Sequence, residues 1–124
     1  MKKVLLIDDE KDFCMFLKKN LEIRGGYTVL VANNGKDGIA AAVRNRPDLI
    51  LLDIIMPGMS GFDVLKELKE RDETTAIPVI MLTAVNKDEA KERALELYNE
   101  DYIIKPVLLS DLDAKIKDVL SRRF

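Results

Sequence analysis

Short apolar runs alternate with longer amphipathic stretches along the whole chain of 124 residues, and this alternation constrains the fold more than any other feature. The apolar runs are predicted to be strands: 4–7, 27–32, 49–55, 78–84 and 101–106. The intervening stretches have apolar residues at helical spacing and are predicted to be helices: 11–24, 35–46, 61–71, 87–98 and 110–120. Strict alternation of this kind predicts an α/β fold, doubly wound, whose parallel sheet has helices on both faces.

Composition narrows the class of protein. An apolar content of 48% with 34% charged residues indicates one globular domain with a core of its own. The net charge of −2 argues against a nucleic-acid surface, which needs a clustered basic excess. The single Cys14 cannot form an internal disulfide and is expected to be a packing residue. Because no apolar stretch approaches membrane-spanning length, we expect a cytoplasmic protein with no membrane contact.

Polar side chains occupy the ends of most of the predicted strands. Ligands of an open α/β sheet bind outside the carboxyl ends of its strands, so these residues are expected to converge. They are Asp8 and Asp9 after the first strand, Asp53 in the third, Thr83 in the fourth, and Lys105 before Pro106 in the fifth. Asp53 is the most informative, since an unpaired carboxylate within an apolar run is costly to bury.

The charges of this group predict a divalent cation. Three carboxylates and one ammonium sum to −3 + 1 = −2. Oxygen ligands without histidine or an available thiolate favour Mg²⁺ over zinc or copper. A cation would also hold the neighbouring acids ionised together. Such a site suits phosphoryl transfer to the Asp53 carboxylate, with Lys105 and the Thr83 hydroxyl stabilising the phosphoryl oxygens.

These residues, within "LLIDDE", "LILLDIIMPGMSGFDVL", "PVIMLTA" and "DYIIKP", resemble the receiver domain of two-component response regulators. The resemblance covers essentially residues 1–124 and implies a flavodoxin-like sheet with strand order 2-1-3-4-5. It implies that Asp53 is the phosphoacceptor, supplied by a sensor histidine kinase or a phosphotransfer protein. It further implies that such a domain is a phosphorelay switch and not an enzyme beyond Mg²⁺-assisted self-phosphorylation and slow autodephosphorylation.

The resemblance assigns the remaining site residues as well. Asp9 would ligate Mg²⁺ directly, Asp8 largely through water, and the Ile55 backbone carbonyl would be the third protein ligand beside Asp53. Lys105 would contact the phosphoryl group, and the Lys105–Pro106 peptide bond would be cis. Glu10 is expected only to be an acid in the first turn of a helix.

Switching is also implied by the resemblance. Thr83 would move toward the phosphoryl group, and Tyr102 would swing inward behind it. The face formed by the predicted helix 87–98, strand 101–106 and helix 110–120 would then bind a downstream protein partner. The domain would be a monomer or a phosphorylation-linked dimer.

Three features remain as separate expectations. Ile55 cannot orient a hydrolytic water, so a long phosphoryl lifetime is expected. Tyr98 and Asn99 stand where many members of the family have Gly-Ala, next to the output face. Ser110 and Asp113 resemble a capping box at the start of the last helix.

The main alternative is a pseudo-receiver, an interaction module with this fold that is not phosphorylated, although no acidic or lysine position is lost here. A flavin mononucleotide carrier would need a phosphate-binding loop where this chain has three acids. An aspartate-nucleophile phosphatase would need a D-x-D arrangement after the first strand, and a Mg²⁺ nuclease would need a basic track.

Overall fold

The computed structural model describes residues 1–83 and 101–122, and of Thr83 only the backbone. The strands are β1 (Lys2–Ile7), β2 (Tyr27–Ala32), β3 (Leu49–Asp53), β4 (Val79–Thr83) and β5 (Asp101–Ile104). The helices are α1 (Lys11–Arg24), α2 (Gly35–Asn45), α3 (Gly61–Glu70) and α5 (Leu109–Ser121). The predicted helix 87–98, with Tyr98 and Asn99, lies outside the described residues, and so does Ala84.

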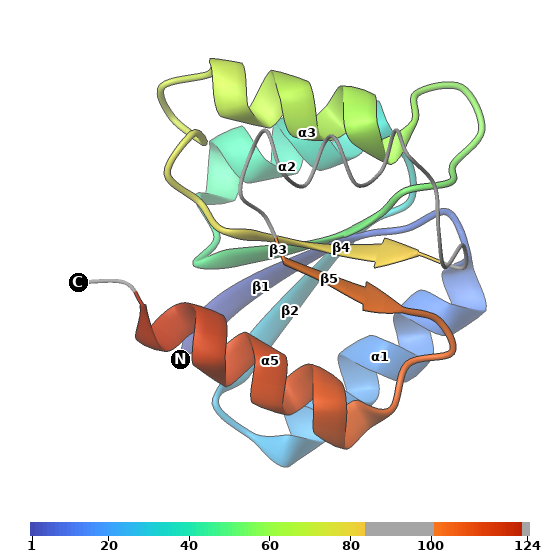
Figure 1. Ribbon diagram of the computed structural model, residues 1–124, viewed down its shortest axis with the longest axis vertical. Helices are drawn as coiled ribbons and strands as arrows, with labels where there is room; N and C mark the ends of the chain where they lie inside the picture. Colours follow the sequence, from blue (N-terminus) through green and yellow to red (C-terminus); the bar gives the residue numbers. More distant parts are fainter. Residues whose placement is uncertain (84–100, 123–124) are drawn as a thin grey trace.

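The five strands form one parallel sheet in the order β2-β1-β3-β4-β5, which confirms the expected topology (Figure 1). Helices α2 and α3 cover one face of the sheet, and α1 and α5 cover the other (Figure 1). Strand β1 pairs with β2 on one side and β3 on the other, so the chain reverses its direction of winding there. The carboxyl ends of β1 and β3 therefore lie side by side at the point where such sheets bind ligands.

Burial on both faces explains why the central strands are continuous apolar runs. Alternate side chains of β1 and β3 point to opposite faces. Leu5 and Leu52 join the core beneath α2 and α3, whereas Leu6 and Leu51 join the core beneath α1 and α5. A strand with two buried faces has no solvent-facing position, which makes the carboxylate of Asp53 at the end of β3 exceptional.

Strand β3 ends two residues earlier than expected. The backbone N–H of Ile54 still donates to the carbonyl of Leu82 at 3.0 Å, but the carbonyl of Ile54 accepts from Gly61 at 2.8 Å. The chain thus turns away from the sheet directly after Asp53. Ile55, which was expected to be inside the strand, is 58% exposed in the loop that follows β3.

Helices α1, α2 and α3 begin at the predicted residues, whereas the start of α5 differs from expectation. The capping box predicted for Ser110 and Asp113 is wrong, because α5 begins at Leu109 with Leu108 as its N-cap and no side-chain cap. Asp113 is buried and accepts a hydrogen bond of 2.8 Å from the Tyr27 hydroxyl, which ties α5 to β2. A complete capping box is present instead at the start of α3, between Ser60 and Asp63.

None of the helices in the described ranges is both long enough and apolar enough to span a membrane.

Candidate functional site

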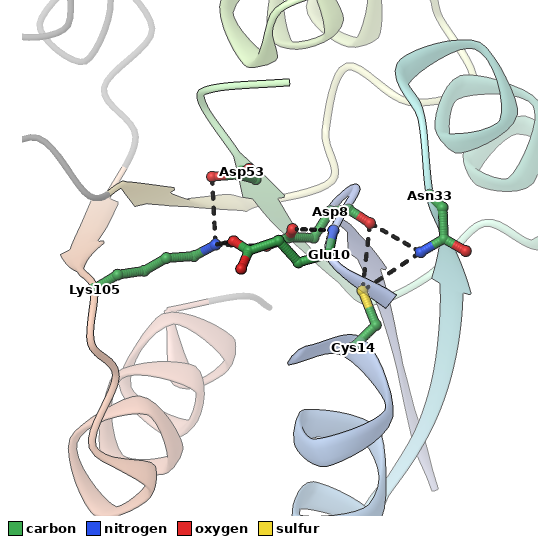
Figure 2. A network of polar contacts seen from close by, with 6 residues as sticks. All are labelled: Asp8, Glu10, Cys14, Asn33, Asp53 and Lys105. Atoms are coloured by element: carbon green, nitrogen blue, oxygen red, sulfur yellow. Dashed lines mark hydrogen bonds and ion pairs between the residues drawn. The ribbon is translucent and has the colours of Figure 1, made fainter. Parts of the chain in front are cut away.

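Two buried carboxylates lie at the carboxyl ends of the central strands. Asp8 directly follows β1 and is fully buried, and Asp53 ends β3 with 4% of its surface exposed. The Lys105 side chain crosses to them from the end of β5 (Figure 2). Its Nζ lies 2.8 Å from Asp8 Oδ2 and 3.6 Å from Asp53 Oδ1. The fold therefore brings together three of the residues that the sequence indicated, from strands far apart along the chain.

Glu10 is a site residue that the sequence did not predict. Its Oε1 lies 3.0 Å from Lys105 Nζ, and its side chain is 63% exposed (Figure 2). The expectation that it is only an acid in the first helical turn is wrong, since Glu10 is the N-cap of α1 and makes no side-chain cap. No local signal pointed to this contact, because its partner lies 95 positions away along the chain.

Asp8, Glu10 and Asp53 each present a carboxylate oxygen within 4.8 Å of the others. Asp9, expected to be the direct metal ligand, contributes no oxygen to this group, and its side chain is half-buried. Ile55 follows Asp53 by two positions in the exposed loop. The roles of Asp9 and of the Ile55 carbonyl thus stay predictions.

The remaining predicted residues lie on β4, β5 and the segment after it. Thr83 ends β4, where its backbone pairs with Ile104, but its hydroxyl lies outside the described residues. Tyr102 is in β5 and is 44% exposed, and its role in switching stays a prediction. The Lys105–Pro106 peptide bond is cis, as expected.

The backbone of Asp8 is held by two side chains beneath the acidic group. Asn33 Nδ2 donates to the Asp8 carbonyl at 2.9 Å, and Cys14 Sγ donates to the same oxygen at 3.4 Å (Figure 2). Burial and the charge of Asp8 raise the pKa of the Cys14 thiol to about 12. Cys14 is therefore a packed donor and not a nucleophile, as its position in the sequence suggested.

The negative charge of Asp53 is poorly compensated by the charged side chains around it. Burial and the charge of Asp8 raise the pKa of Asp53 to about 6, against the opposing influence of Lys105. Burial alone would lower the pKa of Lys105, but its hydrogen bonds to Asp8 and Glu10 and the charge of Asp53 raise it to about 12. Lys105 is thus firmly charged, whereas Asp53 has an excess of negative charge around it that a cation would relieve.

Comparison with known proteins identifies the family. Residues 4–117 match the response regulator receiver domain. The chain belongs to the response regulator receiver domain family. Receiver domains are signalling modules that interact with histidine kinases and downstream effectors. The recognition of the family from the sequence is thereby confirmed.

Two known proteins match this chain over almost its full length. The chain is 38% identical to the alkaline phosphatase synthesis transcriptional regulatory protein PhoP of Bacillus subtilis over 121 residues. It is 40% identical to the phosphate regulon transcriptional regulatory protein PhoB of Pseudomonas aeruginosa, also over 121 residues. Each match covers 98% of this chain but only 49% and 52% of the relatives, so the chain spans about half of their length.

Solved structures confirm the fold of the receiver domain. The chemotaxis protein CheY4 of Vibrio cholerae superposes with a TM-score of 0.87 at 28% identity, covering 96% of this chain and 98% of that one. A two-component response regulator from Clostridium difficile superposes with a TM-score of 0.87 at 36% identity, covering 99% and 98%. The chain therefore has the flavodoxin-like fold of these receiver structures, with the strand order 2-1-3-4-5.

The acidic group fits the cation that receiver domains typically bind, which is Mg²⁺. Mg²⁺ prefers carboxylate oxygens and retains several waters. Asp8, Glu10 and Asp53 offer such oxygens close together, and the described site contains no nitrogen or thiolate ligand that would favour a softer metal.

Proposed function

We propose that this receiver domain is a signalling switch that accepts a phosphoryl group on Asp53. The donor would be the phosphohistidine of a sensor histidine kinase or of a phosphotransfer protein. The observation that supports the proposal most directly is the position of Asp53, a buried carboxylate at the end of a central strand with Lys105 3.6 Å away. We further propose that it acts in the cytoplasm and that residues 1–124 form one domain.

The chemistry needs an ionised Asp53 and nearby positive charge. An Asp53 carboxylate oxygen would form a bond to phosphorus while the phosphorus–nitrogen bond breaks and the imidazole leaves with the electron pair. Lys105 would donate to a phosphoryl oxygen, as would the Thr83 hydroxyl. Mg²⁺, held by Asp53, Asp9 and the Ile55 carbonyl and through water by Asp8, would neutralise further phosphoryl charge and lower the pKa of Asp53.

Output would pass through protein contact. We propose that Thr83 and Tyr102 respond to the phosphoryl group and that the face formed by residues 87–98, β5 and α5 then binds a downstream protein. The domain would act as a monomer or a phosphorylation-linked dimer. The acidic balance of the chain, −2 overall, favours protein partners over nucleic acid or a membrane surface for this domain.

Incubation with Mg²⁺ and acetyl phosphate tests the proposal against a pseudo-receiver. The wild-type domain is expected to gain the mass of one phosphoryl group, only when Mg²⁺ is present, whereas Asp53→Ala gains none. Asp12→Asn, which removes an exposed acid from the first turn of α1, is the matched control and should be labelled like the wild type. Absence of label on the wild type, or label kept by Asp53→Ala, would favour the pseudo-receiver or another acceptor.

The exposed Ile55 provides a prediction about the lifetime of the phosphoryl group. Its aliphatic side chain, 58% exposed in the loop after Asp53, cannot hydrogen bond an attacking water. We expect Ile55→Asn to lose its phosphoryl group several-fold faster than the wild type, because an amide can orient that water. Phosphate release after removal of the donor measures the rate, with Ile55→Leu as the apolar control. Equal or slower release from Ile55→Asn would contradict the prediction.

A further inference from the structure

The position of the Lys105 ammonium is determined mainly by residues other than Asp53. Its Nζ donates hydrogen bonds of 2.8 Å to Asp8 and 3.0 Å to Glu10, whereas Asp53 lies at 3.6 Å, beyond hydrogen-bond distance. The Phe13 ring packs against the same ammonium, with its centroid 4.4 Å from Nζ. Two of the three ammonium hydrogens are therefore donated to acids that the proposed chemistry does not phosphorylate.

Asp8 and Glu10 differ in their freedom to release Lys105. Asp8 is fully buried, and its other carboxylate oxygen accepts from the Glu10 backbone N–H at 2.9 Å, so its orientation is fixed. Glu10 is 63% exposed, and the contact with Lys105 is the one described polar contact of its side chain. Only Glu10 can rotate into solvent without leaving a buried polar group unpaired.

We propose that Glu10 is a positioning residue that holds Lys105 away from Asp53 in the resting domain and so slows phosphorylation. This inference rests on the proposed function. With acetyl phosphate, an oxygen of Asp53 bonds to phosphorus as the bond between phosphorus and the acetyl oxygen breaks, and acetate leaves with the electron pair. The Lys105 ammonium, 3.6 Å from Asp53, must move toward the phosphoryl oxygens during this step, and it can do so once Glu10 has released it.

Replacing Glu10 with aspartate tests the contact with Lys105 separately from the negative charge of residue 10. Glu10→Asp keeps the negative charge, but its side chain is one methylene shorter. An aspartate at an N-cap also accepts from the backbone N–H groups of the first helical turn, which draws it away from Lys105. Glu10→Gln removes the charge at constant size, and Asp12→Asn removes a neighbouring exposed charge from the same helix.

The rate of phosphorylation by acetyl phosphate is measured at saturating Mg²⁺. We expect Glu10→Asp and Glu10→Gln to react about fivefold faster than the wild type, a factor appropriate to the loss of one ion pair whose acid is exposed. Asp12→Asn should react at the wild-type rate. Wild-type behaviour of Glu10→Asp would overturn the proposal, because the charge of residue 10 and not its contact with Lys105 would then matter.

A second readout does not depend on phosphorylation. The NMR signal of the Lys105 ammonium, recorded without Mg²⁺ or donor, should shift and exchange faster with water in Glu10→Asp, while Asp12→Asn leaves it unchanged. An unchanged signal in Glu10→Asp would overturn the proposal. A wild-type domain that takes no label would refute the proposed function instead, and the Lys105 signal would still decide whether Glu10 holds the ammonium.

Discussion

Replacing Gly61 with alanine is expected to destabilise the domain by at least about 3 kcal/mol, at the severe end of overpacking. An added Cβ would lie 2.2 Å from the carbonyl oxygen of Asp53 and 2.6 Å from the Cα of Ile54. Both obstacles are backbone atoms, which cannot rotate away as a side chain can. The Gly61 N–H also donates to the Ile54 carbonyl at 2.8 Å, so relief of the overlap would break the turn that follows Asp53.

Gly58→Ala is the matched control for this substitution. Gly58 lies in the same loop at a φ of +76° with nothing near its missing Cβ, so alanine there introduces only backbone strain of about 1 kcal/mol. Chemical denaturation of both variants measures the difference. Equal stability of the two variants would show that the chain accommodates a Cβ at position 61 and that the close approach of α3 to Asp53 is not required.

Asp53→Asn is expected to stabilise the metal-free domain by about 2 kcal/mol at neutral pH. The pKa of Asp53 is about 6 in the folded chain against an ordinary value of 3.8, a difference equivalent to about 3 kcal/mol. Asparagine removes this cost but also removes the attraction to Lys105, which reduces the gain. Thermal or chemical unfolding in the presence of a chelator measures the effect.

The pH dependence of this difference has a definite sign. The folded state holds a proton on Asp53 that the unfolded state has lost between the two pKa values, so wild-type stability from this group falls as pH rises from 3.8 through about 6. The advantage of Asp53→Asn should therefore be full above this range and vanish below it. Mg²⁺ should reduce or reverse the advantage, because it stabilises the folded wild type by binding. A difference independent of both pH and Mg²⁺ would contradict this explanation.

Much of the fold could be predicted from local sequence patterns. The run in β3 indicates a central strand because it is apolar on both faces, and strict alternation of strands with helices predicts a parallel sheet. Asp53 stood out as a site residue for the same reason, since a carboxylate in such a run needs a special partner. The convergence of Asp8, Asp53 and Lys105 then followed from the parallel sheet itself.

The parts that the sequence could not predict depend on side-chain contacts between distant elements. Glu10 contacts Lys105 across 95 positions of the chain, and no local pattern distinguishes it from an ordinary acid at a helix start. Asp113 follows Ser110 at capping-box spacing, but a hydrogen bond from Tyr27, 86 positions away, uses its carboxylate instead. In both cases a tertiary partner outweighed a weak local preference.

Peptide mapping of the phosphorylated domain tests the central claim most directly. After reaction with acetyl phosphate and Mg²⁺, borohydride reduction of the acyl phosphate marks the modified residue, and mass spectrometry of the peptides locates it. We predict a single mark at Asp53, dependent on Mg²⁺ and absent when Asp53 is replaced. A mark on Asp8, Asp9 or Glu10 instead, or no mark on a correctly folded wild-type domain, would contradict the assignment of Asp53 as the phosphoacceptor.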